Sequence, residues 1–176
     1  DFIKSIFQRN FMLKIQIDGI VQGVGFRPFI FRLATELNLK GFVLNCNSGV
    51  IIEAKGSKTN LDNFLRRIKT ELPPAAEIKN IFSEEKPAKN YRNFEIRKSD
   101  ANEGSTLISP DLAVCEDCLH EFFDAKDPRY HYAFINCTNC GPRYSIIENT
   151  PYDRPRTSMK IFRMCDFCHR EYTNPL

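Results

Sequence analysis

The chain has 176 residues, of which 42% are hydrophobic, and its formal net charge is +3. This length allows one ordinary domain or two small ones, and the apolar share argues against a disordered chain. The charge is too close to neutral to indicate a nucleic-acid partner, although it leaves room for a local anion site. The longest run without acidic residues, lysine or arginine, 130–142, is too short and too polar to span a membrane.

Hydrophobic periodicity predicts a βαββαβ domain over residues 12–99, after an N-terminal extension over residues 1–11. The expected elements are a strand over 13–19, a helix opening at Pro28, strands over 42–46 and 50–54, a helix over 61–72, and extended stretches near 78–84 and 94–97. Pro28 suits the first helical position, and Thr59 is the expected N-cap of the second helix. The predicted fold class is α+β, a ferredoxin-like sandwich.

The loop between the first strand and the first helix carries a candidate anion site. Residues 19–27 read Gly-Ile-Val-Gln-Gly-Val-Gly-Phe-Arg. Gly23 and Gly25 allow successive N–H groups to turn inward, which forms a phosphate-binding nest at the positive end of a helix. Arg27 can grip phosphate oxygens bidentately, and because it precedes a proline its backbone is expected to be extended. A plain glycine turn with a solvated arginine is the alternative interpretation of these residues alone.

The full loop resembles the first signature of the acylphosphatase family, through its Gln-Gly-Val-x-Phe-Arg core. A second string, Gly-Phe-Val-Leu-Asn over residues 41–45, resembles the second signature of that family. The resemblance implies that phosphate is bound by Gln22, Gly23, Val24, Gly25, Phe26 and Arg27. It also implies that Asn45 orients the attacking water, so that Arg27 and Asn45 are the expected catalytic residues. An acyl phosphate is already activated, so positioning and charge neutralisation suffice without a side-chain nucleophile.

The sequence contains seven cysteines, six of them in Cys-x-x-Cys pairs. The odd count and the close pairs argue against a disulfide framework and favour a metal in the reducing cytoplasm. The remaining cysteine, Cys46, follows Asn45 directly. Because neighbours on a strand point to opposite faces, Cys46 is expected to be buried and to face away from the site.

The first two pairs predict a closed tetrahedral zinc site formed by Cys115, Cys118, Cys137 and Cys140. A redox dithiol is the alternative, but it usually lies at a helix start in a thioredoxin-like setting. The third pair, Cys165 and Cys168, repeats the first at an offset of 50 residues and supplies only half of a second zinc site. His120, His131 and His169 are possible substitute ligands, although each is expected to be a surface residue. A linker over 100–112 and an irregular, zinc-stabilised region over 113–176 are therefore predicted.

An acylphosphatase-like domain followed by this cysteine repeat resembles the N-terminal part of HypF-type carbamoyltransferases, in which the cysteines form zinc fingers. The strings that carry this resemblance are Cys-Glu-Asp-Cys-Leu, Asn-Cys-Thr-Asn-Cys-Gly-Pro-Arg-Tyr and Met-Cys-Asp-Phe-Cys-His-Arg-Glu-Tyr. The resemblance implies a role in nickel–iron hydrogenase maturation, with carbamoyl phosphate as substrate. It also implies that further domains, absent from this sequence, pass the carbamoyl group to a HypE-type acceptor protein.

Two functions of different classes are compatible with the sequence. The first is hydrolysis of carbamoyl phosphate as the opening step of carbamoyl transfer. The second is a non-catalytic zinc ribbon that binds protein or nucleic acid. Nucleic-acid binding is disfavoured because the basic residues of the second part are dispersed among acids and prolines, namely Arg143, Arg154, Arg156, Lys160, Arg163 and Arg170.

Overall fold

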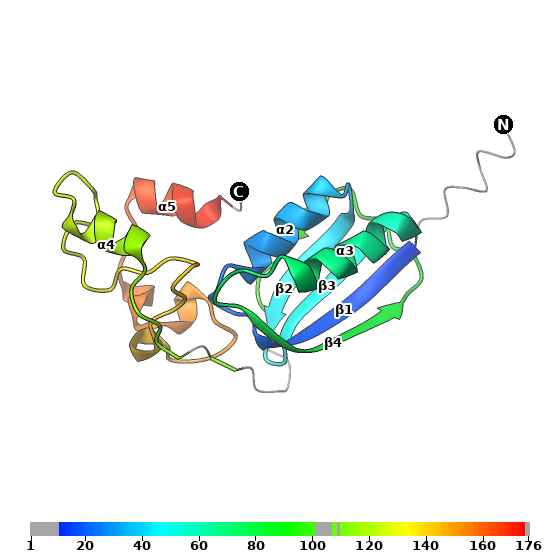
Figure 1. Ribbon diagram of the computed structural model, residues 1–176, viewed down its shortest axis with the longest axis horizontal. Helices are drawn as coiled ribbons and strands as arrows, with labels where there is room; N and C mark the ends of the chain where they lie inside the picture. The colour runs from blue at the N-terminus through cyan, green and yellow to red at the C-terminus, as the bar shows by residue number, and fades with distance from the viewer. Residues whose placement is uncertain (1–10, 101–106, 109, 175–176) are drawn as a thin grey trace, which may run out of the picture.

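The computed structural model describes residues 11–100, 107–108 and 110–174. The expected extension, apart from Phe11, and much of the expected linker lie outside the described residues. Figure 1 shows two parts side by side, a sheet covered by two helices and a smaller part built from short helices and loops. None of the helices in the described ranges combines the length and apolarity needed to cross a bilayer.

The first part has the predicted βαββαβ order, followed by a short edge strand. Its elements are β1 (Phe11–Ile20), α2 (Phe26–Glu36), β2 (Lys40–Cys46), β3 (Gly49–Gly56), α3 (Lys58–Thr70), β4 (Glu77–Glu85) and β5 (Phe94–Ile96). The sheet order is β4-β1-β3-β2-β5. The pairs among the first four strands are antiparallel, whereas β5 pairs with β2 in parallel. The α+β, ferredoxin-like prediction is therefore confirmed.

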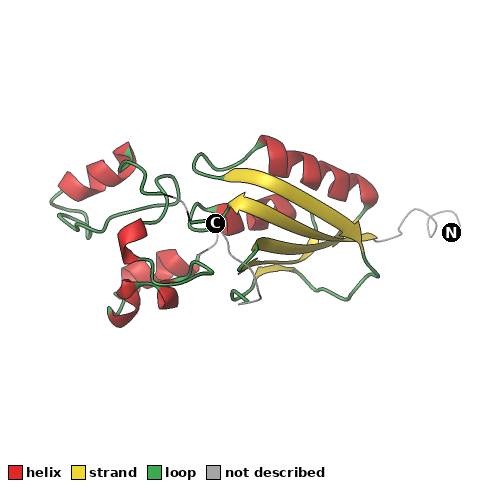
Figure 2. Cartoon of the chain, turned by 90° about the horizontal axis from the view of Figure 1, so that it is seen from below, coloured by secondary structure: helices red, strands yellow, loops and turns green. Residues whose placement is uncertain are grey.

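Both helices pack against the same face of the sheet, as Figure 2 shows from below. The apolar stripes of the two helices meet the inward-facing residues of β1 and β3 in one continuous core. Its fully buried members include Ile17, Leu33, Ile52, Phe64 and Ile68. Burial of each such side chain stabilises the fold by about 1.5–3 kcal/mol, so this part has a core of its own.

The structure differs from the prediction at the start of both helices. Helix α2 begins at Phe26 because Gly25, with φ 73°, forms its N-cap. Arg27 is therefore helical rather than extended, and Pro28 is the third helical residue, where the first turn still needs no N–H donor. Helix α3 begins after Ser57, whose hydroxyl accepts a hydrogen bond from the Asn60 N–H at 3.2 Å, so the predicted cap was placed too late.

The second part is largely irregular, as predicted, but it contains two short α-helices that the sequence did not reveal. Its elements are α4 (Glu116–Phe123), the short 3-10 helices η1 (Tyr144–Ile146), η2 (Arg154–Arg156) and η3 (Ser158–Ile161), and α5 (Asp166–Thr173). Each α-helix starts directly after the first cysteine of a Cys-x-x-Cys pair. Two cysteines, Cys118 and Cys140, form a very small buried cluster with Ile135, so apolar packing contributes little here.

The side chain of Gln22 joins the loop after β1 to two other segments. Its Nε2 donates hydrogen bonds to the carbonyl oxygens of Cys46 and Gly49, both at 2.8 Å, at the turn between β2 and β3. Its Oε1 accepts a hydrogen bond from the backbone N–H of Tyr152, in the second part, at 2.7 Å. Gln22 is only 3% exposed, so its amide fixes the loop, the turn and the second part relative to one another.

Replacing this amide by a carboxylate tests its role. We expect Gln22→Glu to lower the free energy of unfolding by about 1–3 kcal/mol, because both donors are lost and two buried carbonyl oxygens face a carboxylate. Gln16→Glu is the matched control, since Gln16 is exposed and should change stability by no more than about 0.5 kcal/mol. Urea unfolding of both variants measures the difference, and equal values would refute the role of Gln22.

Candidate functional site

The loop between β1 and α2 has the backbone geometry of an anion-binding nest. Gly23 and Gly25 have φ angles of 77° and 73°, in the left-handed region that glycine adopts most readily. In the described part of the chain, the backbone N–H groups of residues 23–27 donate no hydrogen bond to another protein group. These unpaired donors lie at the N-terminus of α2, where the helix dipole favours negative charge.

The predicted loop residues contribute in different ways. The side chains of Val24 and Phe26 are buried in the core between the sheet and the two helices, so only their backbone groups remain for a ligand. Gln22 uses its side chain to fix the loop. Arg27 alone presents a charged side chain, 22% exposed, at the junction of the two parts. Backbone donors and one guanidinium are therefore the groups that face an anion.

Asn45, near the end of β2, is fully buried, and only one of the two polar atoms of its amide has a hydrogen-bond partner among the described residues. Its Nδ2 donates a hydrogen bond to the carbonyl oxygen of Tyr152 at 3.3 Å. Its Oδ1 is buried without a hydrogen-bond partner among the described residues. An unpaired buried oxygen costs about 1–3 kcal/mol, which a water or ligand donor would recover. Cys46 is also buried, as expected, and its Sγ lies 3.2 Å from the Ser48 hydroxyl.

Two residues of the second part, Tyr152 and Asp153, contact every polar side chain of the predicted site. The backbone of Tyr152 bonds both Gln22 and Asn45. The Asp153 Oδ1 lies 2.8 Å from Arg27 Nη2, and its Oδ2 accepts a hydrogen bond from the Ser99 hydroxyl. Sequence analysis missed both residues, because more than a hundred positions separate them from Gln22, Arg27 and Asn45 and no local motif marks them.

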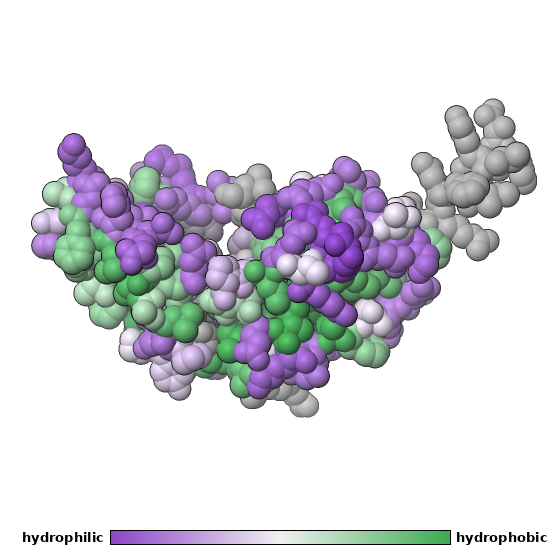
Figure 3. All heavy atoms as spheres, in the orientation of Figure 1, coloured by the Kyte–Doolittle hydropathy of each residue, from purple (hydrophilic) through white to green (hydrophobic). Residues whose placement is uncertain are grey.

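The site opens into space between the two parts. Figure 3 shows the parts as two lobes with a hollowed surface where they meet. A groove of about 1340 Å³ runs along this junction, past Gly23, Gly25 and Arg27 on one side and Tyr152 on the other. A smaller cleft of about 240 Å³ reaches Arg27 from the second part, past Phe134 and Asp153. A ligand on the loop would therefore be reached from this junction.

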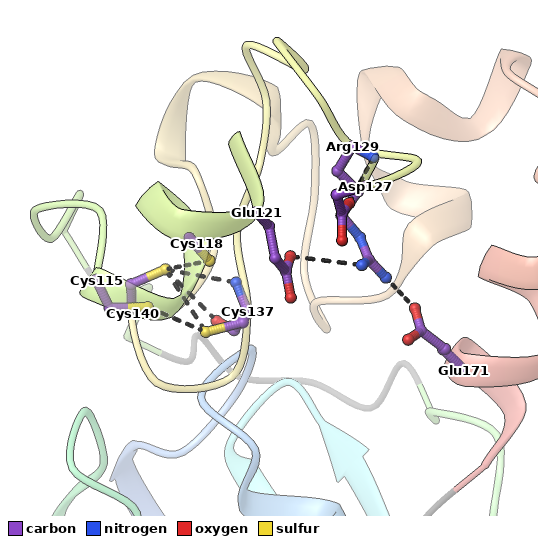
Figure 4. Close-up of polar contacts among 8 residues, drawn as sticks. All are labelled: Cys115, Cys118, Glu121, Asp127, Arg129, Cys137, Cys140 and Glu171. Carbon is purple, nitrogen blue, oxygen red and sulfur yellow. Dashed lines mark hydrogen bonds and ion pairs between the residues drawn. The ribbon is translucent and has the colours of Figure 1, made fainter. Parts of the chain in front are cut away.

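The four cysteines predicted to bind metal come together in space, as Figure 4 shows. Their sulfur atoms all lie within 4.8 Å of one another. Individual S···S distances are 3.5 Å for Cys115 and Cys137, 3.9 Å for Cys118 and Cys140, and 4.0 Å for Cys137 and Cys140. A tetrahedral zinc with Zn–S bonds of about 2.3 Å separates its sulfurs by about 3.8 Å, so the donor set fits such an ion.

The surroundings of the cluster favour thiolate at one position. Burial opposes ionisation of Cys140, but backbone N–H donors and the nearby Arg143 lower the pKa of its thiol to about 7. The Arg143 Nη2 lies 3.1 Å from Cys140 Sγ, and its Nη1 donates to the Leu112 carbonyl oxygen. Burial raises the pKa of Cys118, which a bound cation would have to overcome. The geometry and the donor set of the cluster therefore suit a metal ion.

The third pair does not join a comparable cluster. In the described ranges, no group of three or more potential metal ligands includes Cys165, Cys168 or any histidine. Figure 4 shows Arg129 between Glu121 of α4 and Glu171 of α5. Arg129 Nη1 is 3.4 Å from a Glu121 carboxylate oxygen, and Nη2 contacts Glu171. One ion-pair network thus links α4 to α5.

Comparison with known proteins agrees with this division. Residues 13–96 match the acylphosphatase family, and residues 114–147 match the HypF finger. An acylphosphatase from Thermotoga petrophila is 44% identical over 86 residues, which cover 48% of this chain and 94% of that protein. The carbamoyltransferase HypF of Synechocystis sp. is 47% identical over 149 residues, which cover 85% of this chain but 19% of that protein.

Solved structures extend the similarity over both parts. A crystal structure of full-length HypF in the phosphate- and nucleotide-bound form has a TM-score of 0.89 and 51% identity, covering 96% of this chain and 22% of that one. The structure of T. kodakarensis HypF has a TM-score of 0.79 and 47% identity, covering 94% and 21%. This sequence thus spans about a fifth of the length of its HypF relatives. Residues 13–96 belong to the acylphosphatase family, and the chain as a whole is similar to the acylphosphatase and zinc-finger region of HypF carbamoyltransferases.

Proposed function

We propose that this chain hydrolyses carbamoyl phosphate at the loop of residues 22–27, as the first step of carbamoyl transfer in nickel–iron hydrogenase maturation. The observation that carries the proposal is the set of unpaired N–H groups over residues 23–27 beside Arg27. These N–H groups lie at the start of α2, where the positive end of the helix suits a phosphate dianion. The phosphate named for a full-length HypF structure supports the same ligand class here.

In this proposal the reaction needs no protein nucleophile. The loop N–H groups and Arg27 hold the phosphoryl oxygens and offset the charge that develops on them. The unpaired Oδ1 of Asn45 accepts a hydrogen bond from a water and orients its oxygen toward phosphorus. As the new O–P bond forms, the bridging P–O bond breaks, its electrons leave with carbamate, and a phosphate oxygen takes the proton.

Arg27 remains able to bind phosphate while it contacts Asp153. The contact with Asp153 uses the Nη2 atom alone, and Arg27 has no other ion pair in the described residues. A guanidinium carries several N–H donors in a planar fork, so Nε and Nη1 stay available for phosphate oxygens. The ion pair and the proposed substrate therefore do not exclude one another.

We propose that the four-cysteine cluster holds a structural zinc ion and that Cys165 with Cys168 forms half of a second site. Four thiolates leave no open coordination position, which is typical of structural rather than catalytic zinc. A site of reduced thiols favours a cytoplasmic location, which we propose for this protein. In the longer protein, other domains would pass the carbamoyl group to a HypE-type acceptor protein.

The contacts of the basic residues disfavour the alternative of a nucleic-acid-binding ribbon. Arg143, Arg154 and Arg156 each donate to backbone carbonyl oxygens of their own part. Lys160 is paired with Glu148. Cations that are engaged within the chain release few counterions on binding DNA or RNA, so little affinity is gained from them.

Two substitutions separate phosphate binding from turnover. Arg27→Ala should lower carbamoyl phosphate hydrolysis by about a hundredfold or more and weaken inorganic phosphate binding, because the guanidinium serves both. Asn45→Ala should lower the turnover rate comparably with a much smaller loss of phosphate affinity. Phosphate release and calorimetric titration measure the two effects. Arg32→Ala, on the exposed face of α2, is the control, and full activity of Arg27→Ala would refute the proposal.

Metal content can be predicted in the same way. The purified chain should contain one tightly bound zinc per monomer, which Cys118→Ser should abolish because three thiolates no longer close the tetrahedron. Cys46→Ser and Cys165→Ser should keep the ion. Native mass spectrometry with elemental analysis gives the stoichiometry. Two tight zinc ions per monomer, or retention of zinc by Cys118→Ser, would contradict the assignment.

A further inference from the structure

The second part of the chain, residues 110–174, includes the residues matched to the HypF finger and is called the finger below. It lies directly against the phosphate loop. A Cβ atom added to Gly23 would lie 2.8 Å from Pro142 Cγ and 3.1 Å from Tyr152 Cδ1. One added to Gly25 would lie 2.8 Å from Thr138 Cβ. Thr138 lies between Cys137 and Cys140, and Pro142 follows Cys140 by two positions, so very few residues separate the cysteine cluster from the loop. The finger is therefore placed to act on the acylphosphatase site.

We propose that Tyr152 and Asp153 are positioning residues of this site, an inference that rests on the proposed acyl-phosphate hydrolysis. Asn45 provides the first argument. Its amide can bond in two orientations, and the Tyr152 carbonyl oxygen accepts from Nδ2. This bond directs Oδ1, the acceptor assigned to water, away from Tyr152 and leaves it unpaired. The finger backbone thus sets the orientation of the water-binding amide.

Asp153 acts on Arg27 in the same way. Among the described residues it is the ion-pair partner of Arg27, and its second carboxylate oxygen is held by the Ser99 hydroxyl. The residue before Asp153, Tyr152, is held in place by the hydrogen bond from its N–H to the buried Gln22. A long arginine side chain loses considerable rotamer entropy when it is ordered, and this contact removes part of that cost before substrate binds.

The same carboxylate could instead compete with phosphate for the loop. A carboxylate seated in the nest would accept hydrogen bonds from the loop N–H groups. Instead, the oxygens of Asp153 contact Arg27 and Ser99, and the N–H groups of residues 23–27 stay unpaired in the part of the chain that the structure describes. Asp153 therefore lies beside the nest and orients Arg27 without filling the phosphate position.

Two variants of the full zinc-loaded chain test this inference. Asp153→Leu should lower kcat/KM for carbamoyl phosphate by about tenfold and weaken inorganic phosphate binding by a similar factor, because Arg27 loses its orientation. Asp153→Asn keeps an oxygen that can accept from Arg27 and should stay within about threefold of the unmodified chain. This rescue separates positioning from general destabilisation. Glu148→Gln, an exposed acid of the same region, is the control and should change neither value.

Three outcomes would overturn the inference. Unchanged activity of Asp153→Leu would show that Arg27 needs no positioning. Tighter phosphate binding by Asp153→Leu and Asp153→Asn alike would make Asp153 a competitor. Equal losses in both variants would point to charge or folding. If the unmodified chain hydrolysed no acyl phosphate, the proposed function would fail separately. Calorimetric titration with inorganic phosphate would then decide the role of Asp153 by itself.

Discussion

The arrangement of the molecule depends on the hydrogen bonds of one buried amide, that of Gln22. Its two donors hold the turn between β2 and β3, and its acceptor holds the Tyr152 N–H of the zinc-finger region. Two of these bonds are buried and the third is partly buried, and leaving a buried partner of this amide unpaired costs about 1–3 kcal/mol. This amide therefore links the phosphate loop, the turn after the strand that carries Asn45, and the second part of the chain.

Most of the first part could be predicted because local patterns encode it. Alternation in β1 and the apolar stripes of α2 and α3 are periodic features that a sequence displays directly. The first residues of the helices were harder to predict. Several neighbouring residues suit the N-cap of each helix, and backbone angles select Gly25 for α2 and Ser57 for α3. In the second part, α4 and α5 are only eight residues long, too short to show a clear period.

The candidate site was predictable only where it is local in the chain. The loop and Asn45 lie in short strings with a recognisable chemistry, and the spacing of the four cysteines indicates a tetrahedral ion. The contribution of Tyr152 and Asp153 was not predictable. Tyr152 acts through its backbone, which carries no residue-specific signal, and Asp153 is one of many acids. Only the packing of the finger against the loop reveals them.

Amide hydrogen exchange at Tyr152, measured by NMR in the zinc-loaded chain, tests the union of the two parts most directly. The Tyr152 N–H should exchange slowly in the unmodified chain, and Gln22→Ala should abolish this protection because the acceptor is lost. The Tyr132 N–H, which donates to the Arg129 carbonyl oxygen within the finger region, should keep its protection and report that this region stays folded. A Tyr152 amide that exchanges at the rate of an unprotected group in the unmodified chain would contradict the account.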